Sequence, residues 1–115
     1  MPNDLSGEAL DAKFFEVCWP GQVHVDRTGL RQLSKPPVST DATACEAWAM
    51  RWAREQGLSW RLDQSGRRNE CRAEVFGTHQ GHEVAVHAYG TDWKEAFVRA
   101  CEAAGQVLNQ AKGGA

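Results

Sequence analysis

The chain has 115 residues, of which 42% are apolar and 24% are charged, a composition typical of one soluble globular domain. Its 13 basic and 15 acidic residues give a net charge of −2, which excludes both a generally basic nucleic-acid coat and a strongly acidic DNA mimic. No apolar run approaches the roughly 20 residues that a membrane span needs. The N-terminus begins with acidic residues and shows no signal peptide, so we expect a cytoplasmic protein that does not contact membranes.

Residues 1–5 are predicted to form a loose leader, and residues 6–38 a helix followed by an extended connector. The helix is expected from Ser6, its predicted N-cap, to Cys18, because Leu10, Phe14 and Val17 recur at helical spacing. The helix is predicted to end at Trp19-Pro20-Gly21. Alternating side chains favour a short strand over residues 22–26, and residues 27–38 complete the connector.

A second helix is predicted after three candidate N-caps, Ser39-Thr40-Asp41. Thr43 and Glu46 are the alternative capping pair if the helix begins later. An apolar stripe contains Cys45, Trp48 and Trp52, and Gly57 is a good C-terminal stop.

Three strands follow, centred on the alternating segments 58–63, 71–76 and 84–89, with turns over 64–69 and 78–82. Connections this short favour an antiparallel meander, and the alternation predicts one buried face and one more polar face. A final helix begins near Asp92 and Glu95, carries a continuous apolar stripe from Trp93 to Leu108, and ends at residues 112–114.

The predicted fold class is therefore α+β: a helix, a three-stranded antiparallel meander and a helix (α-β-β-β-α) over residues 39–112, with an additional N-terminal helix, in a single domain. The domain could have two layers, or its sheet could be sandwiched between other elements. The N-terminal helix is expected to cover part of the remaining sheet face or to reach a second subunit.

Several short segments resemble a known family. An "LD…V…W" segment is matched by Leu10-Asp11, Val17 and Trp19. A "P-x-STD" helix entry is matched by residues 37–41, and the "A-W" pair that follows it by Ala47-Trp48. The last helix, over residues 96–104, is similar to "A-I-C-R-A-A-L-x-A", with Cys and Arg displaced. On these segments, which span about residues 9–108, the chain resembles the phage ABA sandwich domain. The resemblance implies a phage or prophage origin and supplies no catalytic residues.

The order of elements also resembles a double-stranded-RNA-binding domain. That family places a Lys-Lys-x-x-Lys cluster at the start of its final helix to contact phosphates. Residues 91–95 here read Thr-Asp-Trp-Lys-Glu, and one lysine between acids is poor for phosphate binding. Nucleic acid is therefore an alternative partner that the sequence does not favour.

Enzyme and metal signatures are weak. The four cysteines, at positions 18, 45, 71 and 101, form no C-x-x-C pair, and Cys45 and Cys101 are predicted to be reduced, buried, small hydrophobic residues. His79, His82 and His87 could share an ion with Cys71, but a solvated His-rich turn is the simpler interpretation. Without a nucleophile elbow, phosphate loop or dinucleotide fingerprint, we expect no enzyme, no catalytic residue, no metal and no cofactor.

Residues 51–72 are locally basic, and a predicted turn tip carries Arg67 and Arg68 within reach of a phosphate backbone or an acidic protein surface. Four of the five tryptophans fit core stripes, whereas Trp19 does not. Because Trp and Arg are enriched at interface hot spots, an aromatic patch could also form a homodimer seam. A solvated charged rim is the alternative. The predicted partner-binding residues are Arg51, Arg54, Arg61, Arg67, Arg68, Arg72 and Trp19.

Together these features predict a non-enzymatic phage or prophage accessory protein that binds a host protein or protein complex in the host-cell cytoplasm, with anti-defence (anti-CRISPR-type) inhibition as the expected role. The alternative is a nucleic-acid-binding module similar to a double-stranded-RNA-binding domain. A metal-dependent enzyme that uses the histidines, and a small-molecule sequestering protein, are further hypotheses.

Overall fold

The computed structural model describes residues 6–22, 24–25, 27–29, 35–64 and 66–113. Helix α1 (Gly7–Cys18) is followed by one continuous helix with three segments, α2 (Ala42–Ala44), the π-helical η1 (Cys45–Met50) and α3 (Arg51–Glu55). The strands β1 (Leu58–Gln64), β2 (Cys71–His79) and β3 (His82–Gly90) precede the long helix α4 (Trp93–Gly113). The α+β class, the antiparallel meander and the N-terminal helix are confirmed.

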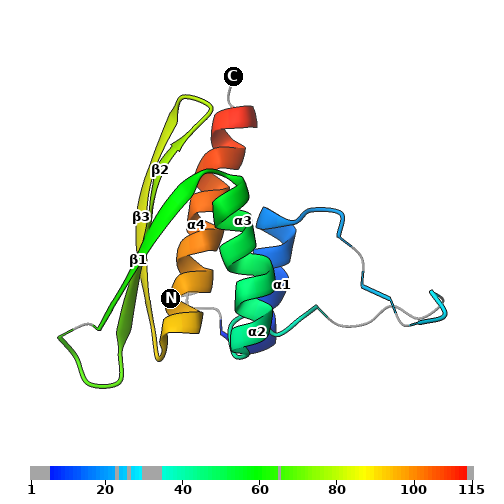
Figure 1. Cartoon of the computed structure of the whole chain (residues 1–115), viewed down its shortest axis with the longest axis horizontal. Coiled ribbons are helices and arrows are strands. Elements are labelled where there is room, and N and C mark those ends of the chain that lie inside the picture. Colours follow the sequence, from blue (N-terminus) through cyan, green and yellow to red (C-terminus); the bar gives the residue numbers. More distant parts are fainter. Residues whose placement is uncertain (1–5, 23, 26, 30–34, 65, 114–115) are drawn as a thin grey trace.

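The three strands form one antiparallel sheet in the order β1-β2-β3. Figure 1 shows the sheet on one side of the molecule and all the helices on the other, so the arrangement has two layers. Helix α4 packs across β2 and β3. Its Phe97 ring meets the Trp60 ring of β1 edge to face, with the centroids 5.4 Å apart. The sheet face toward α4 is called the inner face below, and the opposite face the outer face.

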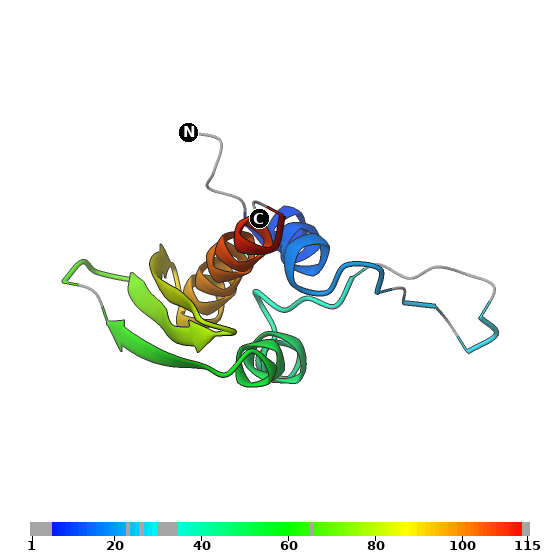
Figure 2. The ribbon, with the colours of Figure 1, turned by 90° about the horizontal axis from the view of Figure 1, so that it is seen from above.

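Helix α1 lies against α4, on the side away from the sheet (Figure 2). The expectation that it covers the second sheet face was wrong. Its buried residues Leu10, Phe14 and Phe15 find their apolar surroundings among the other helices, so α1 belongs to the same core. The helices approach closely at Gly105, where an added Cβ would lie 2.7 Å from Cγ1 of Val17 and 3.0 Å from Sγ of Cys18. A larger residue at position 105 would push α1 away from α4.

The N-terminal capping prediction holds in part. Ser6 occupies the N-cap position of α1, but its side chain makes no capping hydrogen bond.

Of the predicted strand over residues 22–26, Val23 and Asp26 lie outside the described residues. The leader residues 1–5 and part of the connector, residues 30–34, also lie outside them. Val25 is exposed.

The second helix begins where the sequence indicates. The N-cap is Asp41, because the backbone N–H of Ala44 donates to its Oδ2 at 2.9 Å. The alternative pair Thr43 and Glu46 lies inside the helix. Gly57 follows the helix at φ +74°, the left-handed conformation that favours glycine. The π-helical turn of η1 has no signal in the sequence.

The hairpin between β2 and β3 is tighter than predicted. Residues 78–82 were expected to form the turn, but Thr78 and His79 belong to β2 and His82 to β3. His79 pairs with His82, which leaves a two-residue turn of Gln80 and Gly81 with φ of +52° and +82°. Two positive φ angles match the right-handed twist of the strands.

Helix α4 begins with the predicted cap. The backbone N–H of Glu95 donates to Oδ1 of Asp92 at 3.0 Å, and the backbone N–H of Thr91 donates to Oε1 of Glu95 at 2.7 Å. One core unites α1, η1, α3, the strands and α4. Its buried members include Leu10, Phe14, Cys45, Ala49, Trp52, Leu58, Ala73, Val75, Val84, Phe97, Ala100, Cys101, Ala104 and Leu108.

Candidate functional site

The outer face of the sheet is left uncovered by the described residues. Alternation along the strands places one cross-strand row of Ser59, Phe76 and Ala85 on this face. A second row contains Arg61, Glu74 and His87, and a third Asp63, Arg72 and Tyr89. Phe76 is 39% exposed and Tyr89 42% exposed, whereas the core residues Leu58, Val75 and Val84 of the same sheet are buried. This face therefore presents two aromatic rings to solvent.

Charged groups on the outer face balance one another. Arg61 lies 3.7 Å from Asp63 and 4.0 Å from Glu74, and Arg72 lies 3.7 Å from the same oxygen of Glu74. These are long, solvent-exposed ion pairs, which contribute little to folding. The guanidinium groups are thus held on the face while their remaining N–H donors stay available.

The β1–β2 connection continues this surface beyond the ends of the strands. Arg67 and Arg68 are both exposed there, beside Asn69, which has a positive φ of 57°. Of the seven predicted partner-binding residues, four therefore share one region of the molecule: Arg61 and Arg72 on the outer face, Arg67 and Arg68 on its neighbouring loop.

The other three predicted residues lie with the helices. The guanidinium of Arg51 stacks over the Trp19 ring at 5.4 Å and forms an ion pair of 2.9 Å with Glu55. Arg54 lies over the ring of Trp60, 5.7 Å from its centroid, at the border of the inner face. The structure thus separates Arg51, Arg54 and Trp19 from the arginines of the outer face.

Trp19 has a structural partner of its own. Its indole N–H donates to the backbone carbonyl of Trp48 at 3.1 Å, and the two rings meet edge to face. Phe15 and His24 complete this aromatic cluster. The ring centroids of Phe15 and His24 are 5.1 Å apart, and each lies 5.2 Å from the ring centroid of Trp48. Burial of the imidazole and the nearby charge of Lys35 lower the pKa of His24. The cluster joins the end of α1 to η1.

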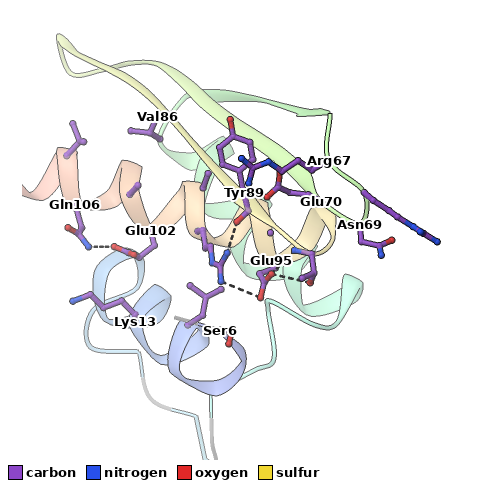
Figure 3. Close-up of a pocket in the computed structure, with 18 of the residues that line it drawn as sticks. Ser6, Lys13, Arg67, Asn69, Glu70, Val86, Tyr89, Glu95, Glu102 and Gln106 are labelled. Carbon is purple, nitrogen blue, oxygen red and sulfur yellow. Dashed lines mark hydrogen bonds and ion pairs between the residues drawn. The ribbon is translucent and has the colours of Figure 1, made fainter. Parts of the chain in front are cut away.

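An open groove of about 1020 Å³ runs along α4. Figure 3 shows Glu95, Glu102 and Gln106 of α4 between Val86 and Tyr89 of β3 on one side and the start of α1 on the other. A guanidinium N–H of Arg99 donates to the backbone carbonyl of Tyr89 at 2.7 Å, and Gln106 donates to Glu102. The lining combines these polar side chains with apolar ones, among them Leu10, Val86 and Val107.

A buried carboxylate links α1 to the entry of the second helix. Asp11 is 5% exposed, and its Oδ1 accepts a hydrogen bond of 2.9 Å from the backbone N–H of Ser39. Burial raises the pKa of Asp11, although the hydrogen bonding from Ser39 opposes that shift. Both residues belong to short sequence motifs, but 28 positions separate them, so their contact has no local signal in the sequence.

The three buried cysteines, Cys18, Cys45 and Cys101, are unsuited to nucleophilic chemistry. Cys45 and Cys101 are buried free thiols, as predicted. Burial raises the pKa of Cys45 to about 12 and that of Cys18 and Cys101 well above the usual range. A thiol with a raised pKa carries almost no thiolate at neutral pH, and the thiolate is the nucleophile.

His79 and His82 face each other beside the β2–β3 turn, but His87 lies apart from them. Nδ1 of His79 lies 3.0 Å from the backbone carbonyl of Gln56, whereas His87 stands on the outer face against the ring of Tyr89. Within the described part of the chain, no three His, Cys, Asp or Glu side chains are arranged to hold one metal ion.

Phe76, His87 and Tyr89 were not singled out from the sequence as partner-binding residues. The signal was the alternation of β2 and β3, which places apolar and aromatic side chains on the face opposite Val75, Val86 and Ala88. An aromatic residue in an alternating strand equally suits a covered second face, and only the packing of the helices decides between the two outcomes.

No helix in the described parts of the chain is long and apolar enough to cross a membrane. Comparisons with models of known families, with curated proteins and with solved structures found no match. The outer face and its loop therefore stand as the candidate site on geometry and chemistry alone.

Proposed function

We propose that this protein is a non-enzymatic binding protein that recognises a host protein through the outer face of its sheet. The observation that carries the proposal is the pair of exposed rings, Phe76 and Tyr89, set among Arg61 and Arg72 on a face that no described residue covers. A few residues carry most of the binding energy in protein interfaces, and Trp, Tyr and Arg are enriched among them.

The geometry of the face suits a protein partner. Phe76 lies on the central strand, and its cross-strand neighbours Ser59 and Ala85 have small side chains. A partner can bury such a ring in a pocket and exclude water around it. The arginines beside it can exchange their long ion pairs for bidentate contacts with a carboxylate of the partner.

The charge of the face favours a protein over a nucleic acid. Arg61 and Arg72 are offset by Asp63 and Glu74 on the same face. Nucleic-acid binding depends on releasing counterions from phosphates, which requires an excess of basic groups. Balanced charge gives specificity for a complementary patterned surface instead.

The proposed setting is a phage or prophage, with an accessory, anti-defence role of the anti-CRISPR type in the host cytoplasm. The resemblance to the phage ABA sandwich domain supports this setting. The hydrogen bond between Asp11 and Ser39 joins two of the segments on which that resemblance rests, which is consistent with both segments serving one shared structural purpose.

The test compares variants of two surfaces. Phe76→Ala with Arg72→Glu changes the outer face, whereas Arg51→Ala with Arg54→Ala changes the helix side and is the matched control. Both proteins are used as tagged baits in nuclease-treated host lysate and expressed in cells that carry a defence system. We expect the outer-face variant to lose a partner that the wild type and the control retain, together with any restoration of phage plating. Equal retention by both variants would contradict the proposal.

Nucleic-acid binding is the second candidate, and the fold is the observation that favours it. Figure 1 shows the β1–β2 loop and the starts of α2 and α4 at the same end of the molecule. Against it, Lys94 at the start of α4 is paired with Asp92 at 3.1 Å. This candidate predicts a duplex-RNA mobility shift that weakens at moderate salt and disappears in Arg67→Ala with Arg68→Ala. A partner that survives nuclease treatment argues against it.

A further inference from the structure

The β3 strand lies at the edge of the sheet, and half of its backbone groups point away from β2. His79 and His82 flank a two-residue turn, so His82 and every second residue after it direct their peptide groups toward β2. The free edge of β3 therefore carries the peptide groups of Glu83, Ala85, His87 and Tyr89, which point away from β2. The Arg99 hydrogen bond to the carbonyl of Tyr89 agrees with this assignment, because Arg99 approaches from the open side.

This edge lacks most of the devices that protect exposed strands. Over its nine residues β3 contains no proline and no lysine, and among the outward residues only Glu83 carries a permanent charge. The opposite edge strand, β1, carries the charged pair Arg61 and Asp63. The groove along α4 leaves room beside β3, and its wall includes the half-buried Val86 and Ala88. An edge of this length and openness is a template for strand pairing.

We propose that β3 pairs with β3 of a second copy of this chain, antiparallel and centred on Ala85, to form a continuous six-stranded sheet. Two-fold symmetry then places Glu83 of one copy opposite residue 87 of the other, twice in each dimer. An imidazole N–H of His87 can donate to that carboxylate. Within the described residues the carboxylate of Glu83 has no other partner.

Two features select this register over its neighbours. Centring the pair on Val86 places Glu83 opposite Tyr89, and centring it on His87 places the two imidazoles opposite each other, so neither gives the reciprocal acid–imidazole pairs. Both also need the carbonyl of Tyr89, which Arg99 already occupies. With Ala85 at the centre, Tyr89 lies opposite the turn residue Gly81 and outside the ladder.

The proposed pairing also continues the two layers. On the inner side, Val84 of one copy lies opposite Val86 of the other, which extends the apolar row. Because the two-fold axis is perpendicular to the sheet, both outer faces lie on the same side. The dimer would present Phe76 and Tyr89 twice on one surface. The pairing does not depend on the proposed function, since it uses the edge and not the face.

Disulfide trapping tests the register. Ala85→Cys places two thiols across the axis at a Cα separation of about 5.5 Å, which suits a disulfide. We expect mild oxidation to convert most of this variant into a covalent dimer. Wild type, with the buried Cys18, Cys45 and Cys101 and the half-buried Cys71, is the background control and should stay uncrosslinked. Glu83→Cys and His87→Cys should each crosslink poorly alone and efficiently when mixed. Crosslinking no greater than wild type in both experiments would overturn the proposal.

A charge exchange and a backbone block complete the test in light scattering and sedimentation. Glu83→Lys removes the acid–imidazole pair and His87→Glu places like charges opposite each other, so each should weaken dimerisation by roughly tenfold. The double exchange restores an opposite-charge pair and should restore dimerisation. Ala85→Pro removes an outward N–H while sparing the β2 ladder, so a folded monomer is expected, with Ala85→Thr as the control that keeps the N–H. A wild-type monomer of 12.7 kDa at high micromolar concentration would contradict the pairing.

Discussion

Val75 and Phe76 are neighbours on β2 and have opposite surroundings. Val75 is fully buried beneath α4, whereas Phe76 is 39% exposed on the outer face. Both residues are apolar, so hydrophobicity alone does not separate them. The difference shows that this sheet has one face that packs in the core and one face that the described residues leave open.

The largest expected effect comes from the covered face. Phe97→Ala removes a fully buried ring that packs on Trp60, and large-to-small changes of this kind cost about 3–5 kcal/mol. Urea unfolding monitored by circular dichroism measures the free energy of unfolding. A loss under about 1 kcal/mol would mean that α4 does not cover the inner face as described.

A second change tests the packing of the helical layer itself. Gly105→Ala places a Cβ 2.7 Å from Cγ1 of Val17, and overpacking costs about 1–3 kcal/mol, against a helix-propensity gain of about 1 kcal/mol. We therefore expect a net loss of stability. Gln110→Ala, at an exposed position of the same helix, is the control and should be nearly neutral. Stabilisation by Gly105→Ala would show that α1 and α4 lie further apart.

Asp11 tests how the N-terminal helix is held. Asp11→Ala leaves the N–H of Ser39 unpaired in a buried setting, which costs about 1–3 kcal/mol. Because the folded-state pKa of Asp11 is raised, its carboxyl favours folding most below its unfolded pKa, and this contribution is lost as pH rises through the folded pKa. The free energy of unfolding of wild type relative to Asp11→Asn should therefore fall as pH rises from about 4. If this difference in the free energy of unfolding rises with pH instead, folding lowers the pKa of Asp11 and does not raise it.

The smallest expected effect on folding comes from the open face. Phe76→Ala removes a ring of the same type as Phe97, yet surface substitutions of this kind usually change stability by under about 0.5 kcal/mol. The same denaturation series measures it. Destabilisation approaching that of Phe97→Ala would mean that Phe76 is buried in solution, for example by another molecule.

Local sequence chemistry predicted the elements well. The caps at Asp41 and Asp92, the stop at Gly57 and the stripe of α4 all lie where their short-range patterns indicate. The two-residue turn was missed because Gln80 is an uncommon residue at a positive φ. The candidate site was predicted only in its arginines, since the exposure of Phe76 depends on what packs above it.

The sequence by itself determined which segments are helices and strands, and which side chains of each strand share a face, because hydrophobic periods of 3.6 and 2 residues are local properties. Only the tertiary structure decided that α1 lies on α4, that Asp11 meets Ser39, and that the outer face and the β3 edge are left uncovered by the described chain. The physical reason is that an apolar helix face is satisfied by any complementary surface. Packing across long sequence separations determines which surface it covers and which surface remains open.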